Sequence, residues 1–384
     1  MKKVTLITII LLIITGCKQS SPHNNLITID VAASYPQKEL VLQNFMNVEY
    51  IALETNDEFI TQGDVKAIGN KCILVKNWIN DGTIFVFDRK SGKGLRKINR
   101  RGQGAEEYTF INGIVLDEDN DEMFVNCTPT KQILVYDLSG NFKRRLNHAE
   151  GTEYLEVFNY DKDNLICYDM SIYYKEGESR GNQSYHIIIS KHDGSITRNI
   201  SIPFDVVKAP FVQKGDGIAV APVRSIIPCG NKWLLVETSS DTVYAYVPVE
   251  NKLKPFVVRT PSNDPEILLT MGTITDRFYF METVKKVFDF TTGRGFPTTG
   301  LMYDKEENAV FNATVLNGDY VKEQKVNMIS NPINNGVIAT YQNLAANKLI
   351  EAYESDGLKG ELKEIAAGLN EESNPVIMLV KYKQ

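Results

Sequence analysis

A cationic, glycine-rich loop at residues 100–108 carries the polar side chains that could do chemistry in this chain. These side chains are Arg100, Arg101, Gln103, Glu107 and Tyr108. A glycine-rich backbone can present N–H groups to an anion, but a nucleotide-binding loop opens a helix, and here a strand pattern follows at residues 110–116. We therefore expect a crossover between two sheets whose glycines adopt positive φ, with the two arginines available to an acidic or polar ligand.

Cys17 is the second candidate for chemistry. Lys2 and Lys3 precede an apolar run of signal-peptide length at residues 4–14, and Ile14-Thr15-Gly16-Cys17 resembles a bacterial lipobox. In a lipobox the cysteine is diacylated and becomes the first residue; an ordinary secretory signal with an incidental cysteine is the alternative. We expect a lipoprotein signal peptide at residues 1–17, a tether at 18–27, and a membrane partner reached through lipidated Cys17.

The remaining cysteines and the histidines give no sign of a metal centre. Cys72, Cys127, Cys167 and Cys229 show no Cys-x-x-Cys spacing. Buried free thiols are expected, while a disulfide in an oxidising compartment is left open because no pair is indicated. The four histidines are scattered, so the sequence predicts no catalytic residue, no metal site and no cofactor.

Composition indicates an acidic globular protein. Its 384 residues are 43% hydrophobic, which is enough for a sizeable core, and the net charge is -6. An acidic chain is a poor nucleic-acid binder, so no nucleic-acid partner is expected. A basic stretch nevertheless spans residues 89–101, and we interpret all of it except Arg100 and Arg101 as a solvated outer strand and its hairpin.

A repeated phrase predicts the elements that must position these residues. An apolar strand at 83–88, a Ser91-Gly92 turn and a second strand at 95–98 return at 132–137, Ser139-Gly140 and 142–146. The third strand of each unit recurs at Ile84, Ile133, Ile187 and Val243, which gives spacings of 49, 54 and 56 residues. A period near 50 with about four strands is typical of propeller blades.

Strand patterns predict six blades. The predicted strands of the first four are 64–68, 72–76, 83–88 and 95–98; 110–116, 122–126, 132–137 and 142–146; 155–160, 165–168, 185–190 and 196–200; 217–227, 232–237, 242–246 and 253–258. Beyond Pro261 the pattern is weaker: a fifth blade is predicted at 277–282, 285–290, 300–304 and 309–315, and a sixth begins at 326–330 and 336–341.

Both ends of the chain complete the sixth blade. The pattern changes to helical periodicity at about residues 344–369, which indicates a short helical insertion before a final strand at 375–382. Pairing of that strand with residues 48–53 would close the ring and remove two exposed sheet edges. The predicted fold class is therefore all-β: a six-bladed β-propeller over residues 28–384, closed by N- and C-terminal strands.

These features resemble the six-bladed β-propeller lipoproteins of Bacteroides-type bacteria, which are distantly NHL-like. In that family the loop after the first blade reads roughly Gly-x-x-Gly-x-Gly-Pro-x-Glu-Tyr. Gly102, Gln103, Gly104, Glu107 and Tyr108 match it, whereas Asn99 and Ala105 replace the usual Gly and Pro. Residues 48–55 and 374–377 also resemble family features. The family has no generally accepted activity, so the resemblance implies a fold and a compartment but no reaction.

Two functions are compatible with these sequence features. We expect first a non-catalytic binding or scaffold module that holds a protein, peptide or glycan partner in the cell envelope. The alternative is a periplasmic hydrolase or lyase, which needs at least two acid/base groups within hydrogen-bond reach in the central funnel. The predicted location is a lipid anchor in the outer membrane with the propeller in the periplasm, because residues 18–21 lack acidic side chains that often accompany surface export; surface display is left open.

Overall fold

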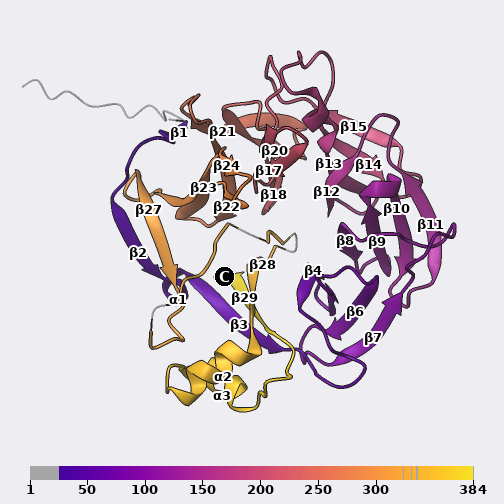
Figure 1. The fold of residues 1–384 in the computed structure, drawn as a ribbon, viewed down its shortest axis with the longest axis vertical. Coiled ribbons are helices and arrows are strands. Elements are labelled where there is room, and N and C mark those ends of the chain that lie inside the picture. Colours follow the sequence, from indigo (N-terminus) through magenta and orange to yellow (C-terminus); the bar gives the residue numbers. More distant parts are fainter. Residues whose placement is uncertain (1–25, 323, 330, 334–335, 384) are drawn as a thin grey trace, which may run out of the picture.

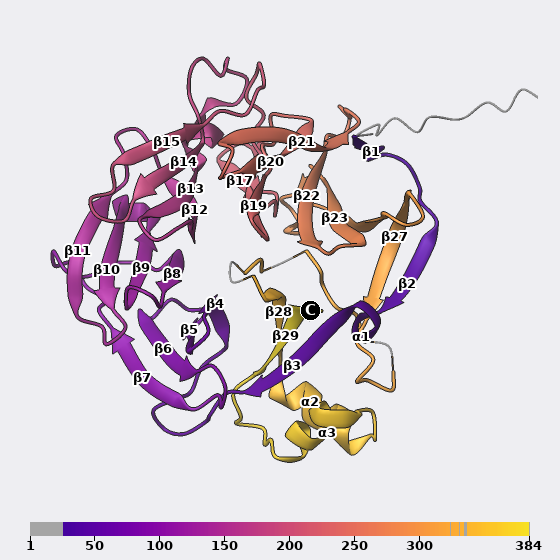
Figure 2. The same ribbon diagram turned by 180° about the vertical axis from the view of Figure 1, so that it is seen from behind.

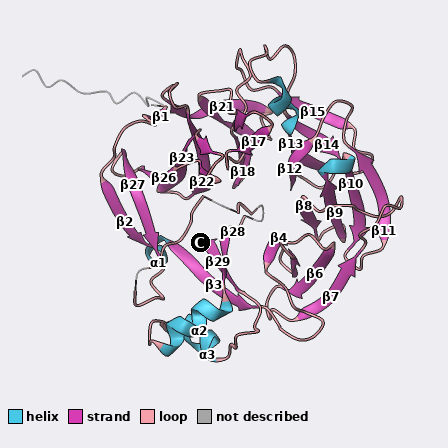
Figure 3. Cartoon of the chain, viewed as in Figure 1, coloured by secondary structure: helices cyan, strands magenta, loops and turns pink. Residues whose placement is uncertain are grey.

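The structure, a computed structural model, describes residues 26–322, 324–329, 331–333 and 336–383. Cys17, the predicted signal peptide and residues 18–25 of the predicted tether lie outside the described residues. Six sheets of three to five strands stand around a common centre, and the helices between them are short (Figures 1 and 3). The predicted all-β six-bladed propeller is therefore confirmed. No helix within the described ranges is long and apolar enough to cross a membrane.

Blades 1, 2 and 3 are four-stranded antiparallel sheets built from consecutive strands, close to the predicted positions. Blade 1 consists of β4 (Asp64–Ile68), β5 (Cys72–Lys76), β6 (Thr83–Asp88) and β7 (Gly94–Asn99). Blade 2 consists of β8 (Gly113–Asp117), β9 (Glu122–Cys127), β10 (Gln132–Asp137) and β11 (Phe142–Asn147). Blade 3 consists of β12 (Tyr154–Asn159), β13 (Asn164–Asp169), β14 (His186–Ser190) and β15 (Ile196–Ile200).

The core is divided among the junctions between blades. Successive strand residues point to opposite faces, so Ile73 and Val75 of β5 pack towards blade 6, whereas Leu74 packs towards blade 2. A buried apolar cluster of this kind occupies every junction around the ring in the described part of the chain. Because the middle strands are buried on both faces, they are apolar at consecutive positions rather than alternating.

The repeated Asp and Gly of the sequence build the outer hairpin turn of a blade. Asp88 Oδ1 accepts hydrogen bonds from the backbone N–H and hydroxyl of Ser91, both at 2.7 Å, and Gly92 follows with φ +69°. A Cβ on Gly92 would lie 2.0 Å from the carbonyl oxygen of Ala52 in the preceding blade. Glycine is required here both for its positive φ and because a neighbouring backbone passes so close.

Blades 4 and 5 are five-stranded and depart from the predicted pattern. Blade 4 consists of β18 (Ile226–Cys229), β19 (Lys232–Leu235), β20 (Thr242–Val247), β21 (Lys252–Arg259) and the N-terminal β1 (Ile27–Ile29). Blade 5 consists of β22 (Ile267–Ile274), β23 (Phe278–Lys285), β26 (Thr298–Asp304), β27 (Ala309–Leu316) and β2 (Gln37–Val41). Both N-terminal strands pair in parallel with the last strand of their blade.

Two predicted strands in this half are wrong. Residues 217–227 do not form one strand, because β17 (Gly217–Val220) pairs with β16 (Phe211–Lys214) in a separate hairpin before β18 begins. Residues 285–290 belong instead to a small hairpin of β24 (Phe288–Asp289) and β25 (Arg294–Gly295), whose turn is capped by the Asp289 carboxylate. The inner strand of blade 5 is β22, which the sequence pattern missed.

Blade 6 closes the ring as predicted. It consists of β28 (Ile338–Leu344), β29 (Val376–Tyr382) and β3 (Met46–Ala52), and β29 pairs antiparallel with β3 from Val376–Ala52 to Tyr382–Met46. The predicted strand at 326–330 is wrong for the residues described: the N–H of Val326 bonds to Val315 and the carbonyl of Met328 accepts from Thr273, so this segment lies against blade 5.

The helical insertion is confirmed between β28 and β29. Its helices are α2 (Ala346–Glu354) and α3 (Gly360–Ala367). Leu349 of α2 and Leu362 of α3 are buried in the cluster between blades 5 and 6. The insertion therefore covers the outside of the closing blade, as seen from both sides of the ring (Figures 1 and 2).

Residues 27–52 form a continuous N-terminal belt along the rim of blades 4, 5 and 6 (Figures 1 and 2). The belt runs from β1 to β2, and the short helix α1 (Leu42–Phe45) joins β2 to β3. Glu49 of the belt accepts two hydrogen bonds from Arg89 of blade 1, at 2.7 and 3.0 Å. Arg89 is buried, so it departs from the predicted solvated stretch and fastens the end of the belt to the next blade.

Candidate ligand-binding sites

The glycine-rich loop joins β7 of blade 1 to β8 of blade 2, the inter-blade position that the sequence predicts. Tyr108 is fully buried; its hydroxyl donates to the carbonyl of Gly82 at 2.7 Å and accepts from the N–H of Arg100 at 3.0 Å. Burial raises the pKa of Tyr108 to about 12, so the phenol stays protonated as a donor. Tyr108 therefore holds the connection between blades 1 and 2 in place.

The backbone of this loop is folded around one of its own carboxylates. Glu107 Oε2 accepts a hydrogen bond from the N–H of Gly104 at 2.8 Å. A Cβ on Gly102 would lie 1.8 Å from the same oxygen, which explains why glycine occupies that position. Glu107 thus takes space in the loop that an external anion would need.

The remaining polar side chains of the loop differ in whether they contact the rest of the protein. Arg100 Nε donates to the carbonyl of Gly140 in blade 2 at 2.9 Å, so this arginine links two blades. Arg101 and Gln103 are exposed. The loop brings Arg101 and Gln103 to the surface together, and their contact with a ligand stays a prediction.

Four cysteines and two histidines are buried among the packed strands. Cys72, Cys127, Cys167 and Cys229 are all free and buried. Burial lowers the pKa of both His148 and His186 to about 4, so each is neutral near pH 7. Within the described residues no group of three histidine, cysteine or acidic side chains could hold a metal ion.

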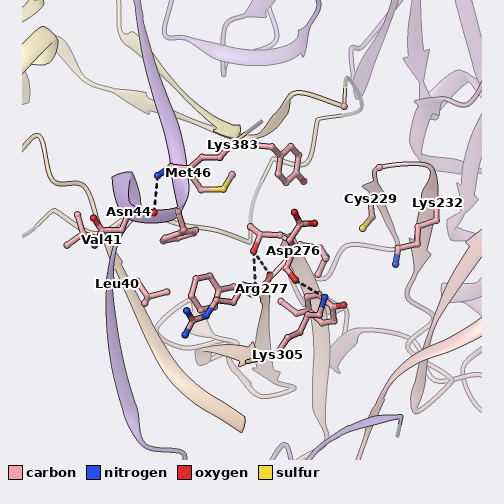
Figure 4. Close-up of a pocket in the computed structure, with 18 of the residues that line it drawn as sticks. Leu40, Val41, Asn44, Met46, Cys229, Lys232, Asp276, Arg277, Lys305 and Lys383 are labelled. Carbon is pink, nitrogen blue, oxygen red and sulfur yellow. Dashed lines mark hydrogen bonds between the residues drawn. The ribbon is translucent and has the colours of Figure 1, made fainter. Parts of the chain in front are cut away.

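A cavity of about 890 Å³ lies among the turns of blades 4 and 5, the belt and the end of β29 (Figure 4). We call it the lysine pocket, because Lys232, Lys305 and Lys383 line it from three separate elements. Lys232 begins β19, Lys305 follows β26, and Lys383 follows β29. The sequence did not indicate this site, since only the closed ring brings three such distant residues together.

None of the three lysines has a carboxylate partner among the described residues. Lys305 Nζ donates to the carbonyl of Asp276 at 2.7 Å, and Lys383 Nζ donates to the carbonyl of Asn44 at 2.9 Å. Lys232 Nζ lies 4.7 Å from the centre of the Phe256 ring. A carbonyl dipole or a ring face offsets only part of an ammonium charge. The lining also contains two carboxylates, Glu39 and Asp276, against four basic side chains, so the pocket keeps an excess of positive charge.

Aromatic rings form one side of the lysine pocket. Tyr279 lines it, and its ring centre lies 5.1 Å from that of Phe256 and 5.7 Å from Lys305 Nζ. Phe278 and Phe45 form a second aromatic contact, with 5.2 Å between their ring centres. Phe278 and Tyr279 belong to an aromatic-rich segment at residues 277–280.

Arg277 also lines the pocket, but its guanidinium is already ion-paired with carboxylates of the protein. Its guanidinium binds both carboxylate oxygens of Asp304, at 3.0 and 2.8 Å, and Lys38 binds Asp304 at 2.8 Å. Burial alone would raise the pKa of Asp304, but hydrogen bonds from Arg277 and Lys38 hold it well below its usual value. Arg277 therefore supports the wall of the pocket instead of offering a free charge.

One buried carboxylate lies outside both sites. Glu237, just after β19, accepts from the N–H and hydroxyl of Ser239 through Oε1, while its Oε2 has no hydrogen-bond partner among the described residues. Burial raises the pKa of Glu237 to about 7. A buried carboxylate with an unsatisfied oxygen destabilises the fold when it is ionised.

Comparison with known proteins agrees with the geometry of the ring. The model of the family DUF5128, described as a 6-bladed beta-propeller, matches residues 18–339. The chain belongs to this family. No curated protein matches the sequence.

Two solved structures from Bacteroides share the fold. One is a Bacteroides fragilis protein described as exported, with 15% identity and a TM-score of 0.61, covering 91% of this chain and 99% of its own. The other is a member of the DUF4221 family from Bacteroides vulgatus, with 11% identity and a TM-score of 0.50, covering 89% of this chain and 99% of its own. At these identities the likeness shows the fold alone.

Proposed function

We propose that this chain is a lipid-anchored, non-catalytic binding module of the cell envelope whose lysine pocket holds an anionic ligand. The observation that carries the proposal is the convergence of Lys232, Lys305 and Lys383 on one cavity without a carboxylate partner in the described residues. In a chain of net charge -6, such a local excess of positive charge attracts anions. The aromatic wall offers apolar area to the body of the same ligand.

Binding is favoured over catalysis by the carboxylates near the axis of the ring. Asp64 and Glu156 line a central cavity, where the hydrolase or lyase alternative would need them. Asp64 is paired with Lys66 at 3.0 Å and with Lys76 at 3.1 Å. The Glu156 carboxylate accepts hydrogen bonds from two consecutive backbone N–H groups, Ser225 at 2.9 Å and Ile226 at 3.0 Å. Both carboxylates are therefore committed to the frame.

Calorimetric titration with hexagalacturonate and with hexaglutamate tests the anion site. We expect at least one of them to bind, and the Lys232→Ala/Lys305→Ala variant to bind about tenfold or more weakly, because each charged hydrogen bond contributes about 1.5–3 kcal/mol. Binding should also weaken between about 20 and about 200 mM salt.

A matched control separates the site from net charge. Lys90→Ala/Lys93→Ala removes the same charge from an exposed turn of blade 1 and should leave the affinity unchanged. Equal affinity in the wild type and the Lys232→Ala/Lys305→Ala variant, or no binding of either probe, would contradict an anion site in this pocket.

Cys17 supplies the proposed anchor. The lipobox-like residues 14–17 support it, as does the start of the family match at Lys18. Nine residue steps separate Cys17 from Leu26 at the rim of blade 4, which is a reach of at most about 30 Å. A lipid on Cys17 would therefore hold the ring close to the membrane by its rim, in the proposed arrangement on the periplasmic side of the outer membrane.

The anchor is tested by Cys17→Ser. The thioether-linked lipid cannot form on serine, so we expect a protein that is unprocessed or no longer extracted with the membrane fraction. Fractionation and detergent partitioning measure both effects. Normal processing together with unchanged partitioning would rule out the anchor.

A further inference from the structure

The central cavity is a second candidate site, on residues that the lysine pocket does not use. It has a volume of about 460 Å³, and its walls include the innermost strands β4, β8 and β12 of blades 1, 2 and 3. These strands lie along one side of the middle of the ring in both views (Figures 1 and 2). Arg224, which precedes β18 of blade 4, Tyr341 of blade 6 and residues 331–333 also line it.

The charges of this cavity are balanced, in contrast to those of the lysine pocket. Its lining contains two acids, Asp64 and Glu156, and two bases, Lys66 and Arg224. Asp64 pairs with Lys66. Burial raises the pKa of Glu156, and the positive charge of Arg224 opposes that rise. A strongly anionic or cationic ligand gains little from such a lining, whereas a neutral ligand with many hydroxyl groups can use its donors and acceptors.

Hydrogen-bond donors remain available on this wall. The Asn112 side chain accepts from the N–H of Thr128 at 2.8 Å, and its amide NH₂ has no partner among the described residues. The Arg224 guanidinium likewise makes no hydrogen bond within the described ranges, although its backbone N–H bonds to Thr270. Amide and guanidinium groups are planar donors that bind vicinal hydroxyls or ring oxygens in pairs.

An exposed indole stands beside this polar wall. Trp78, in the turn between β5 and β6, lines the cavity and is 64% exposed. Its backbone N–H donates to Gln62 at 2.8 Å, and neighbouring Asn77 accepts from the Thr61 hydroxyl at 3.1 Å. The turn is therefore held by the preceding crossover while the indole itself is left in solvent.

We propose that the central cavity binds a neutral saccharide, with Trp78 stacked on the C–H face of a sugar ring. The aromatic platform and the charge-balanced polar wall recognise the two faces that a pyranose offers, one apolar and one rich in hydroxyls. Exposed Ile79 next to Trp78 could instead serve an apolar protein surface, but that surface would leave the polar groups of the cavity unpaired. The proposal is independent of the lysine pocket, because the two sites share no lining residue.

Tryptophan fluorescence reports directly on this site. The chain has two tryptophans, and the other, Trp233, is buried against Phe158 and Tyr160. Acrylamide should therefore quench Trp78 and spare Trp233. Five neutral hexasaccharides serve as probes: maltohexaose, cellohexaose, xylohexaose, mannohexaose and chitohexaose. At least one should protect the quenchable fraction in a saturable way, and hexagalacturonate should protect less.

Variants identify the residues that carry the effect. Arg224→Ala and Asn112→Ala should each weaken protection about fivefold or more, and leave quenching without saccharide unchanged. Trp78→Ala should keep the melting temperature and abolish calorimetric binding of the same saccharide. The Lys232→Ala/Lys305→Ala variant should retain saccharide binding, which keeps failure of this site distinguishable from failure of the lysine pocket.

The outcomes that overturn the proposal are equally specific. They are protection of Trp78 by none of the five neutral probes, stronger protection by hexagalacturonate than by any of them, or unchanged affinity in both Arg224→Ala and Asn112→Ala. Burial of Trp78 by an envelope protein that no saccharide displaces would also overturn it.

Discussion

Blades 1–3 are complete within their own stretch of chain, whereas blades 4–6 depend on the N-terminal belt for their outermost strands. In the first half four consecutive strands make each sheet; in the second, β1, β2 and β3 arrive from more than two hundred residues away. Pairing strands that are so far apart in the sequence costs loop-closure entropy. The hydrogen bonds and packing that the three strands form at the edges of their sheets must offset this cost. We infer that the second half is the less independent one.

The two halves also differ in the positive charge that lines their cavities. The central cavity beside blades 1–3 has two acids and two bases in its lining, and Asp64 pairs with Lys66. The lysine pocket beside blades 4 and 5 is lined by four bases and two acids, and its three lysines have only carbonyl or ring partners in the described structure. The half that is assembled from distant pieces thus holds the cavity with an excess of positive charge.

The largest effect should come from removing the belt. A chain that begins at Gly63 lacks β1, β2 and β3, which exposes the edges of three blades, so we expect insoluble protein or a loss of most of the stability. A chain that begins at Met46 keeps the closing strand β3 and should lose less. Denaturant unfolding against a chain that begins at Leu26 measures both. Equal unfolding midpoints for all three would refute the dependence of blades 4–6 on the belt.

Breaking the link between the belt and blade 1 should have the next largest effect. Glu49→Ala removes a carboxylate bound by Arg89 and Lys381, and we expect a loss of about 1–3 kcal/mol of unfolding free energy. Glu351→Ala, in an exposed pair on α2, is the control and should cost at most about 0.5 kcal/mol.

The Glu49 contribution should also depend on pH. Hydrogen bonds from Arg89 lower the pKa of Glu49 to about 2, so its stabilisation is present above the unfolded pKa near 4.5 and is lost as pH falls towards 2. The difference between wild type and Glu49→Ala should therefore shrink over that range. A difference that stays constant there would mean that the ion pair does not stabilise the closure.

Glu237→Gln should act in the opposite direction with pH. The folded pKa of Glu237, about 7, lies above the unfolded value, so ionisation destabilises the fold as pH rises through 7. We expect the variant to be more stable than wild type by about 1–2 kcal/mol near pH 8 and to gain less near pH 5. Asp169→Asn is the comparison in blade 3: both of its carboxylate oxygens accept hydrogen bonds, so this variant should gain less than Glu237→Gln. Equal effects of Glu237→Gln at the two pH values would contradict this account.

The smallest effect on stability is expected at the predicted binding loop of blade 1. Arg100→Ala/Arg101→Ala should cost at most about 1 kcal/mol, because both side chains are exposed and the pair loses one hydrogen bond, from Arg100 to the Gly140 carbonyl. Tyr108→Phe should cost about 1–2 kcal/mol, since it leaves the Gly82 carbonyl without its donor. Pull-downs from envelope extract at low and moderate salt then compare the folded arginine variant with wild type. Identical partner recovery would remove these two arginines from any functional role.

The parts of this fold that could be predicted are those built from neighbouring residues. The Asp88, Ser91 and Gly92 turn repeats because its hydrogen bonds span only a few positions, and the same local chemistry recurs in blade 2. Closure of β29 on β3 was also predictable, because each end of the chain shows an unpaired strand pattern.

The rest could not be predicted because it depends on distant chain segments. β1 is three residues long, and its exposed and buried positions make sense only beside β21. The pattern also missed β22, whose apolar residues follow the irregular segment around Asp264-Pro265. Lys232, Lys305 and Lys383 are scattered ordinary lysines in sequence, and no local signal distinguishes them from solvated ones. By contrast, the loop at Gly102–Tyr108 has a distinctive sequence. Much of that sequence serves to hold the connection between blades 1 and 2 in place.

The most direct test of a ligand site in blades 4–6 is a crystal structure of the protein soaked with whichever of hexagalacturonate and hexaglutamate binds in solution. We predict density within hydrogen-bond distance of at least two of Lys232, Lys305 and Lys383, with part of the ligand against Tyr279. Density confined to Arg100, Arg101 and Gln103 on blade 1, with the lysine pocket empty, would contradict the account and return the binding function to the loop in the first half of the ring.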